Sequence, residues 1–335
     1  MKILFIGGTG SISTSSSHLL ESKGHKLTLI TRGNRTERLP DTVKHITADF
    51  NYINQDLYKY ITRNLWDCVV NWNIYNKDQA LRDIRLFNGR IKKYYFISTT
   101  AIYGQINRPI NEEIEIYNTI WDYAVSKIKA ENIFREAHIK QNFPVVILRP
   151  GHTYCDFTIP TNIQGLGYGL IEQINEDEEV LIHNDGESQW TLTHSDDFAK
   201  VLSSLLALED INGEIFNIVS SEYKTWKNIY MIYEDQLKKK INTCNVPAEF
   251  IYKKDNLLGL PIIGDKQKNM IFDNSKIRKI IPDFDDFILL EDGLKRSIHW
   301  AKENPEKVYF KKNIKLKIAN IIKSYKQSKE YTFYD

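Results

Sequence analysis

The sequence predicts an α/β protein built around a doubly wound parallel sheet, followed by a smaller domain. Two observations lead to this prediction. In the first half of the chain, short apolar runs alternate with amphipathic stretches, an order typical of right-handed β–α–β crossovers. The apolar runs are also continuous rather than alternating with polar residues, as expected for strands covered on both faces. We therefore expect a Rossmann-type sheet in residues 1–150.

The predicted elements of this sheet follow one another along the chain. Strands are expected at residues 2–6, 26–31, 43–47, 66–72, 94–99 and 144–149. Helices are expected near residues 11–23, 53–63, 76–90 and 121–142. Helical crossovers of this kind return the chain to the same end of the sheet, so the strands should be parallel.

After Pro150 the alternation weakens, and we expect a second, smaller layer. Its predicted elements are a helix near 195–208, a strand at 214–220 that returns to the first sheet, and a helix near 225–240. The acidic run NEDEE (175–179) is interpreted as a solvated turn. The lysine-rich tail, residues 304–335, is predicted to be helical.

Composition and charge narrow the class of protein. Of the 335 residues, 42% are hydrophobic and 26% are charged, which is usual for a soluble globule. The formal net charge of +2 disfavours a dedicated nucleic-acid binder. No apolar run approaches the ~20 residues of a membrane span. Cys68, Cys155 and Cys244 are widely spaced and odd in number, so we expect a cytoplasmic protein without a disulfide framework or a metal cluster.

A glycine-rich turn directly follows the first predicted strand. In GGTGSIS, Gly7 permits a tight turn and Gly10 lets backbone N–H groups approach a pyrophosphate at the start of a helix. The residues around that approach are Thr9, Ser11 and Ile12. The third position of the pattern is Ser13, a small residue that departs only mildly from glycine. The segment predicts a dinucleotide-binding turn.

The end of the second strand bears on which dinucleotide binds. A site that prefers NAD usually has an acidic residue here for the ribose hydroxyls, whereas this chain has Thr31 followed by Arg32. An arginine at this place can pair with the 2′-phosphate of NADP. We therefore expect NADP, with NAD as the alternative. Asp49 and Phe50, after the third strand, are candidates to contact the adenine.

The segment YAVSK carries a candidate catalytic pair. On a helix, Tyr123 and Lys127 lie one turn apart on one face. The residues Ser98, Thr99 and Thr100 end an earlier strand, at the edge where doubly wound sheets bind ligands. Thr99 is the preferred hydroxyl, and Ser98 or Thr100 are the alternatives.

Together, these motifs resemble the extended short-chain dehydrogenases/reductases of the NAD-dependent epimerase/dehydratase family. The matching segments are GGTGSIS, FISTTAIYG, YAVSK, LRPG (148–151), HSDDFAK (194–200) and FDNSK (272–276), so the likeness covers roughly residues 1–300. It implies an NAD(P)-binding domain in residues 1–150, with a later return near 190–220. It also implies a discontinuous substrate-binding domain in residues 151–303.

The resemblance implies a sugar or nucleotide-sugar as substrate, and a homodimer as the assembly. Tyr123 would be the general acid/base. Lys127 would lower the pKa of the phenol and hold the nicotinamide ribose, and Thr99 would hydrogen-bond the reacting oxygen. Thr100 and Ala101 stand where the dehydratases have an acidic pair, which disfavours dehydration. Epimerisation and simple reduction both remain open.

Substrate recognition departs from the family pattern. Trp190 stands where an arginine usually clamps the diphosphate, and Lys266 and Lys268 stand near the place of a second arginine. Trp190 could stack on the substrate or pack in the core. His152 and Thr100 are further candidates to contact the substrate, and His183 and His194 lack the spacing of metal ligands. The alternatives to an enzyme are an RNA-binding relative and an NADP-sensing regulator.

Overall fold

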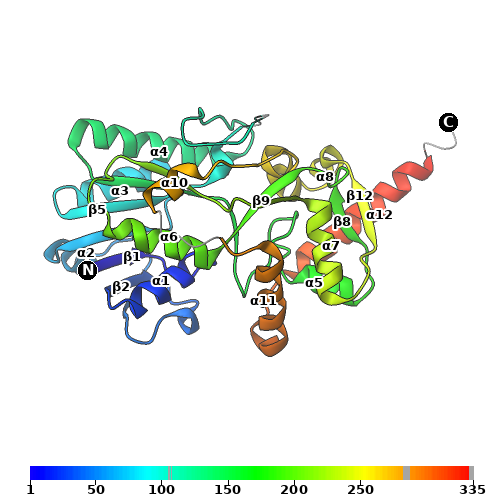
Figure 1. Ribbon diagram of the computed structural model, residues 1–335, viewed down its shortest axis with the longest axis horizontal. Helices are drawn as coiled ribbons and strands as arrows, with labels where there is room; N and C mark the ends of the chain where they lie inside the picture. Colours follow the sequence, from blue (N-terminus) through cyan, green and yellow to red (C-terminus); the bar gives the residue numbers. More distant parts are fainter. Residues whose placement is uncertain (105, 107, 282–286, 332–335) are drawn as a thin grey trace.

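The protein is described by a computed structural model that covers residues 1–104, 106, 108–281 and 287–331. Its centre is a parallel sheet of seven strands in the order β10-β6-β5-β4-β1-β2-β3 (Figure 1). The strands are β1 (Lys2–Ile6), β2 (Lys26–Thr31), β3 (Lys44–Thr47), β4 (Trp66–Asn71), β5 (Ile91–Ile97), β6 (Val145–Pro150) and β10 (Ile215–Ile218). The predicted doubly wound parallel sheet is confirmed.

Helices cover both faces of this sheet, which explains why its strands are continuously apolar. One face packs against α1 (Ser13–Ser22), α6 (Ser195–Ala207) and α10 (Ser275–Ile280). The other face packs against α2 (Gln55–Arg63), α3 (Lys77–Phe87) and α4 (Asp122–Gln141). The strand predicted at 214–220 is β10, which pairs in parallel with β6 at the edge of the sheet.

The second part of the molecule lies beyond the carboxyl edge of the sheet (Figure 1). It contains a three-stranded sheet of β7 (His152–Tyr154), β9 (Gln189–His194) and β11 (Tyr223–Thr225), and the pair β8 (Val180–His183) with β12 (Thr243–Val246). Its helices are α5 (Gly169–Asn175), α7 (Trp226–Leu237), α8 (Ala248–Lys254), α9 (Asn256–Pro261), α11 (Leu290–Glu303) and α12 (Lys312–Tyr331). One hydrophobic core joins these elements.

The lysine-rich tail is helical over α12, and residues 332–335 lie outside the described residues. The acidic run 175–179 is a surface turn that faces this helix. Lys315 bridges to Glu172 at 2.9 Å and to Glu178 at 3.2 Å, and Lys326 bridges to Glu179 at 2.6 Å. The acidic run is therefore paired with the tail rather than simply solvated. No helix among the described residues has the length and apolarity needed to cross a bilayer.

Candidate active site

The glycine turn after β1 has a backbone that side chains would obstruct. Gly7 and Gly8 have φ values of +97° and +127°, a region that favours glycine. A Cβ on Gly8 would lie 2.5 Å from Leu29 Cδ2, whereas a Cβ on Gly10 would meet only Ser13 Oγ, at 3.4 Å. The turn is thus tight beneath Gly8 and open beside Gly10, as a cradle for a pyrophosphate requires.

Hydroxyl groups of α1 fasten this turn to the helix. Ser17 Oγ donates to the Gly8 carbonyl at 3.0 Å, and Thr14 Oγ1 donates to the Gly10 carbonyl at 2.8 Å. Ser13, the departure from the usual third glycine, accepts a hydrogen bond from the Gly10 N–H at 2.8 Å. The serine-rich sequence of α1 therefore replaces part of the packing that glycine gives elsewhere, and the residues present fit a dinucleotide.

The β2 end of this site is cationic. Thr31 is the last residue of β2, as predicted, and Arg32 follows it with an exposed side chain. Arg38 was not anticipated. Its guanidinium lies 4.1 Å from the Phe157 ring centre and donates to the Thr9 carbonyl at 3.4 Å. Burial and the nearby Arg35 lower the pKa of Arg38. The spacing of Arg32, Arg35 and Arg38 at every third position is the feature of the sequence that could have indicated a role for Arg38 beside the glycine turn.

The predicted adenine contacts lie at the end of β3. Asp49 accepts a hydrogen bond from the Asn51 N–H at 2.9 Å, and Phe50 is buried with the Arg82 guanidinium 4.5 Å from its ring centre. This arrangement leaves their assignment to the adenine as a prediction.

Tyr123, Thr99 and Lys127 come together at the carboxyl edge of the sheet. The Thr99 side chain lies near enough to the Tyr123 phenol to act on its pKa. Lys127 is 2% exposed, its Nζ donates to the Ile97 carbonyl at 2.7 Å, and it lies 5.9 Å from the Tyr123 ring centre. Because Thr99 follows β5 and Gly7 follows β1, the group lies at the same sheet edge as the glycine turn. Of the three candidate residues, Thr99 is the one whose side chain influences the pKa of the phenol.

The pKa of Tyr123 does not shift in the direction expected from the sequence. Burial raises the pKa of Tyr123 to about 12, and the Thr99 side chain opposes this only in part. Burial also lowers the pKa of Lys127 to about 7, while the nearby Glu131 opposes the change. Removal from water disfavours both charged forms. The phenol is therefore protonated at neutral pH, which is the state needed to donate a proton.

A buried ion pair lies behind Lys127. Glu131, one turn further along α4, accepts from Arg149 Nε at 3.0 Å and from its Nη2 at 2.6 Å. Arg149 also donates to the Tyr103 hydroxyl at 2.6 Å, and Tyr103 donates to Asn217 on β10 at 2.9 Å. This chain of contacts ties α4 to β6 and β10. The sequence prediction missed it because its members are far apart in the chain.

The substrate candidates lie at different depths. Thr100 begins the 3₁₀ turn η2 (Thr100–Ile102) and is 5% exposed. His152 and Trp190 have ring centres 5.8 Å apart, and Trp190 belongs to the hydrophobic core, 5.6 Å from the Trp226 ring. Lys266 Nζ lies 5.4 Å from the Trp190 ring centre. Of the two interpretations given for Trp190, packing in the core is therefore the one observed.

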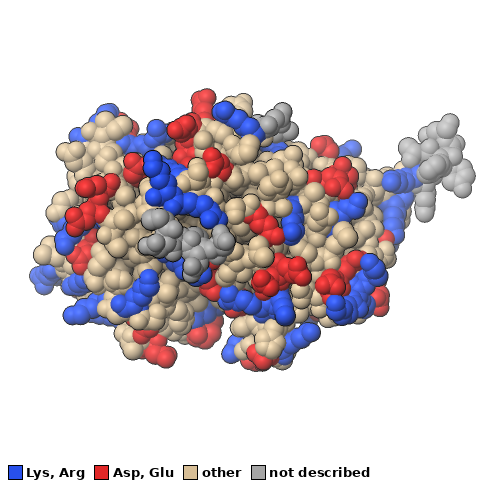
Figure 2. All heavy atoms as spheres, in the orientation of Figure 1, with Lys and Arg blue, Asp and Glu red and all other residues tan. Residues whose placement is uncertain are grey.

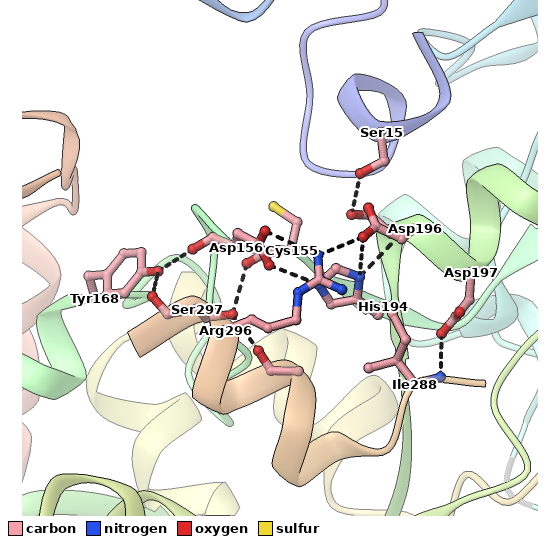
Figure 3. A network of polar contacts seen from close by, with 12 residues as sticks. Ser15, Cys155, Asp156, Tyr168, His194, Asp196, Asp197, Ile288, Arg296 and Ser297 are labelled. Carbon is pink, nitrogen blue, oxygen red and sulfur yellow. Dashed lines mark hydrogen bonds and ion pairs between the residues drawn. The ribbon is translucent and has the colours of Figure 1, made fainter. Parts of the chain in front are cut away.

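A polar network joins the two parts of the molecule next to the glycine turn (Figure 3). Arg296 on α11 donates to Asp196 at 2.6 Å and to Asp156 at 3.2 Å, and His194 lies 3.2 Å from Asp156. The loop that carries Asp156 continues to Thr158, whose hydroxyl accepts from Ser11 at 3.2 Å. The second part of the molecule thus contacts the predicted cofactor turn. Within the described ranges, no group of three or more acidic, histidine or cysteine side chains is arranged to hold a metal ion.

Comparisons with known proteins agree with this geometry. The model of the NAD dependent epimerase/dehydratase family matches residues 3–219. The chain is 22% identical over 296 residues to the 2'-dehydrokanamycin reductase of Streptomyces kanamyceticus, and the match covers 85% of this chain and 80% of that protein. It is 26% identical over 220 residues to the UDP-glucuronate 4-epimerase of Thermodesulfobacterium geofontis, and this match covers 64% of this chain and 61% of that protein.

Among solved structures, the UDP-glucuronic acid 4-epimerase of Bacillus cereus, in complex with UDP-glucuronic acid and NAD, has a TM-score of 0.74. It is 21% identical, and the match covers 90% of this chain and 99% of that one. A parallel sheet with a glycine turn and a Tyr–Lys helix at one edge defines a short-chain dehydrogenase/reductase of the extended type. The chain belongs to the NAD dependent epimerase/dehydratase family, as its motifs predicted, and thus to a class of NAD(P)-dependent enzymes.

Proposed function

We propose that the protein is an NADP-dependent reductase that acts on the keto group of a sugar. One observation carries the proposal: Tyr123, whose pKa is raised by burial, lies near Thr99, and its ring centre is 5.9 Å from the Nζ of the buried Lys127. The reductase of Streptomyces kanamyceticus, matched over most of both chains, supports the direction of reaction.

The roles of the three residues follow from their protonation states and contacts. The nicotinamide, when bound, supplies the hydride that reaches the carbonyl carbon. Tyr123 donates its proton to the carbonyl oxygen, as its raised pKa favours. Thr99 donates a hydrogen bond to the same oxygen and orients it. Lys127 is fixed by the Ile97 carbonyl, from where it can hold a ribose hydroxyl.

The choice of NADP rests on charge around the end of β2. Thr31 supplies no carboxylate there, and the exposed Arg32 and half-buried Arg38 flank the glycine turn. Guanidinium groups pair well with a phosphate through two parallel hydrogen bonds. The 2′-phosphate that distinguishes NADP from NAD would meet this cationic segment.

The substrate need not carry a diphosphate, because Trp190 stands where the family has the arginine that clamps it. The Trp190 indole N–H donates to the carbonyls of Lys266 and Lys268, each at 3.0 Å, and so is not free to bind a phosphate. Epimerisation is the second candidate function, because the matched fold of the Bacillus cereus protein belongs to a UDP-glucuronic acid 4-epimerase. A reductase consumes one NADPH for each product molecule, whereas an epimerase shows no net consumption.

The experiment that tests the proposal is the substitution Tyr123→Phe, which removes only the phenolic oxygen. We expect kcat for NADPH-dependent reduction of keto-sugars to fall by about 10²–10⁴-fold, the usual contribution of a general acid. The affinity for NADPH should stay within about twofold, because the glycine turn and arginines are unaltered.

The matched control is Tyr52→Phe, since Tyr52 is 82% exposed. It should leave both quantities unchanged. A Tyr123→Phe protein with wild-type kcat would reject Tyr123 as the proton donor.

A further inference from the structure

The π-helical turn η3 (Ile262–Lys266) packs against the start of the catalytic helix. A Cβ on Gly264 would lie 2.9 Å from Trp121 Cβ, and Asn118 Nδ2 donates to the Gly264 carbonyl at 3.0 Å. The Trp121 and Tyr123 rings are 4.9 Å apart. The turn is therefore fixed beside the proton donor. Isolated π-helical turns occur frequently at functional sites.

A set of donors from β8, β9 and the loop between them holds this turn in place. The Lys266 carbonyl accepts from Trp190 Nε1 at 3.0 Å and from Ser188 Oγ at 2.9 Å, and His183 Nε2 lies 3.1 Å away. Trp190 Nε1 also reaches the Lys268 carbonyl. Several contacts to one short segment leave it little freedom, so the side chain of Asp265 is presented rigidly.

Asp265 is a buried carboxylate that lacks a donor. It is 7% exposed, and Oδ1 has no hydrogen-bond partner among the described residues. Burial raises the pKa of Asp265 to about 6, and Lys266 and Lys268 oppose the rise. Both lysines act on Asp265 through their charge alone, without a hydrogen bond to its carboxylate. At neutral pH the group is mostly ionised, and an unpaired buried charge is costly.

The negative charge of Asp265 acts on the phenol of Tyr123. It contributes to the raised pKa of Tyr123, after burial and together with Tyr75. Trp121 contacts both segments: its ring centre lies 4.9 Å from that of Tyr123, and its Cβ would lie 2.9 Å from a Cβ on Gly264, the residue before Asp265. A substrate whose carbonyl oxygen contacts Tyr123 would therefore approach the turn η3, which carries Asp265.

We propose that Asp265 binds an ammonium group of the substrate, so that the protein acts on an amino sugar whose amine lies near the reacting carbon. The inference rests on the proposed function, because it assumes that a sugar binds at Tyr123. An ammonium group satisfies the missing donor and compensates the buried charge, and charge-assisted hydrogen bonds are stronger than neutral ones. A sugar hydroxyl would satisfy the oxygen but leave the charge.

The test compares the binding of simple sugars by calorimetry in the presence of NADP⁺. The probes are glucosamine, its 3-amino and 6-amino isomers, and glucose, which differ only in one substituent. At least one amino sugar should bind wild-type protein about tenfold more tightly than glucose. In Asp265→Asn, which has the same shape without the charge, the preference should fall to within about twofold. Asp185→Asn, at an exposed carboxylate, should retain it.

Two results would overturn the inference: no preference for any amino sugar in wild-type protein, or a full preference in Asp265→Asn. Asp265→Ser serves as a second variant if the asparagine protein does not fold. The outcome is separate from that of the proposed function, because binding needs no turnover. If Tyr123→Phe remained active, the proton donor would be wrong, whereas the role of Asp265 would still be decided by these affinities.

Discussion

At the scale of single residues, the sequence predicted the groups that lie within short motifs. Tyr123 and Lys127 are one helical turn apart, and the glycines directly follow a strand, so local spacing determines their relation. Arg38 lies in the 3₁₀ turn η1 (Thr36–Arg38) and Asp265 in the π-helical turn η3, both outside these motifs, so the spacing within the motifs did not point to them. Burial was also invisible in the sequence, and it is burial that sets the pKa directions of Tyr123 and Lys127.

Arg38 makes a prediction at this scale about the choice of cofactor. Arg38→Ala should weaken the binding of NADPH about 10–100-fold, the loss typical of a charged hydrogen bond, and should change NADH binding little. Arg32→Ala should act in the same direction. Fluorescence titration with NADPH and with NADH gives the dissociation constant of each variant relative to the wild type for both dinucleotides.

Arg135→Ala provides the control, because Arg135 is exposed on α4. An equal loss for NADPH and NADH in Arg38→Ala would remove the 2′-phosphate from the interpretation and leave a purely structural role for that arginine.

At the scale of elements, the large sheet was predictable because each strand is an apolar run followed by a change of pattern. The strands at 2–6 and 26–31 have the predicted bounds, and the others differ at their ends by up to three residues. The sheet β7–β9–β11 was not predicted, since two of its strands have only three residues and pair across long separations. The π-helical turn η3 has no periodicity that a sequence could display.

The glycine turn gives a prediction that separates folding from binding. Gly8→Ala places a Cβ against Leu29 at a φ of +127°, so we expect a loss of about 1–3 kcal/mol in the free energy of unfolding. Gly10→Ala has open space beside it and should change stability by less than ~1 kcal/mol. It should instead weaken NADPH binding, because its methyl group occupies the approach to the pyrophosphate.

Urea unfolding and cofactor titration of both variants measure the two effects. If Gly10→Ala bound NADPH as tightly as wild type, the dinucleotide would not lie over this turn.

At the scale of the whole molecule, charges are balanced within the fold. Figure 2 shows Lys and Arg interspersed with Asp and Glu over the face displayed. The tail lysines Lys315, Lys317 and Lys326 are each paired with acidic side chains of the second part. Pairing of this kind leaves fewer cations to contact phosphates, which argues against the RNA-binding alternative.

The tail helix α12 also contributes to the hydrophobic core, and this makes the last prediction. Ile314, Ile318, Ile321 and Ile322 are buried on one face of the helix, with the spacing of an amphipathic helix. Ile318→Ala removes a side chain that is 1% exposed and should lower the free energy of unfolding by about 2–5 kcal/mol. Leu316→Ala, two residues away and 67% exposed, should change it by less than ~0.5 kcal/mol. Because the core of the second part includes both Ile318 and the substrate candidate Trp190, Ile318→Ala should also lower activity at temperatures near the midpoint of thermal unfolding. Equal stabilities of the two variants in urea would mean that the tail is an appendage and that the second part folds without it.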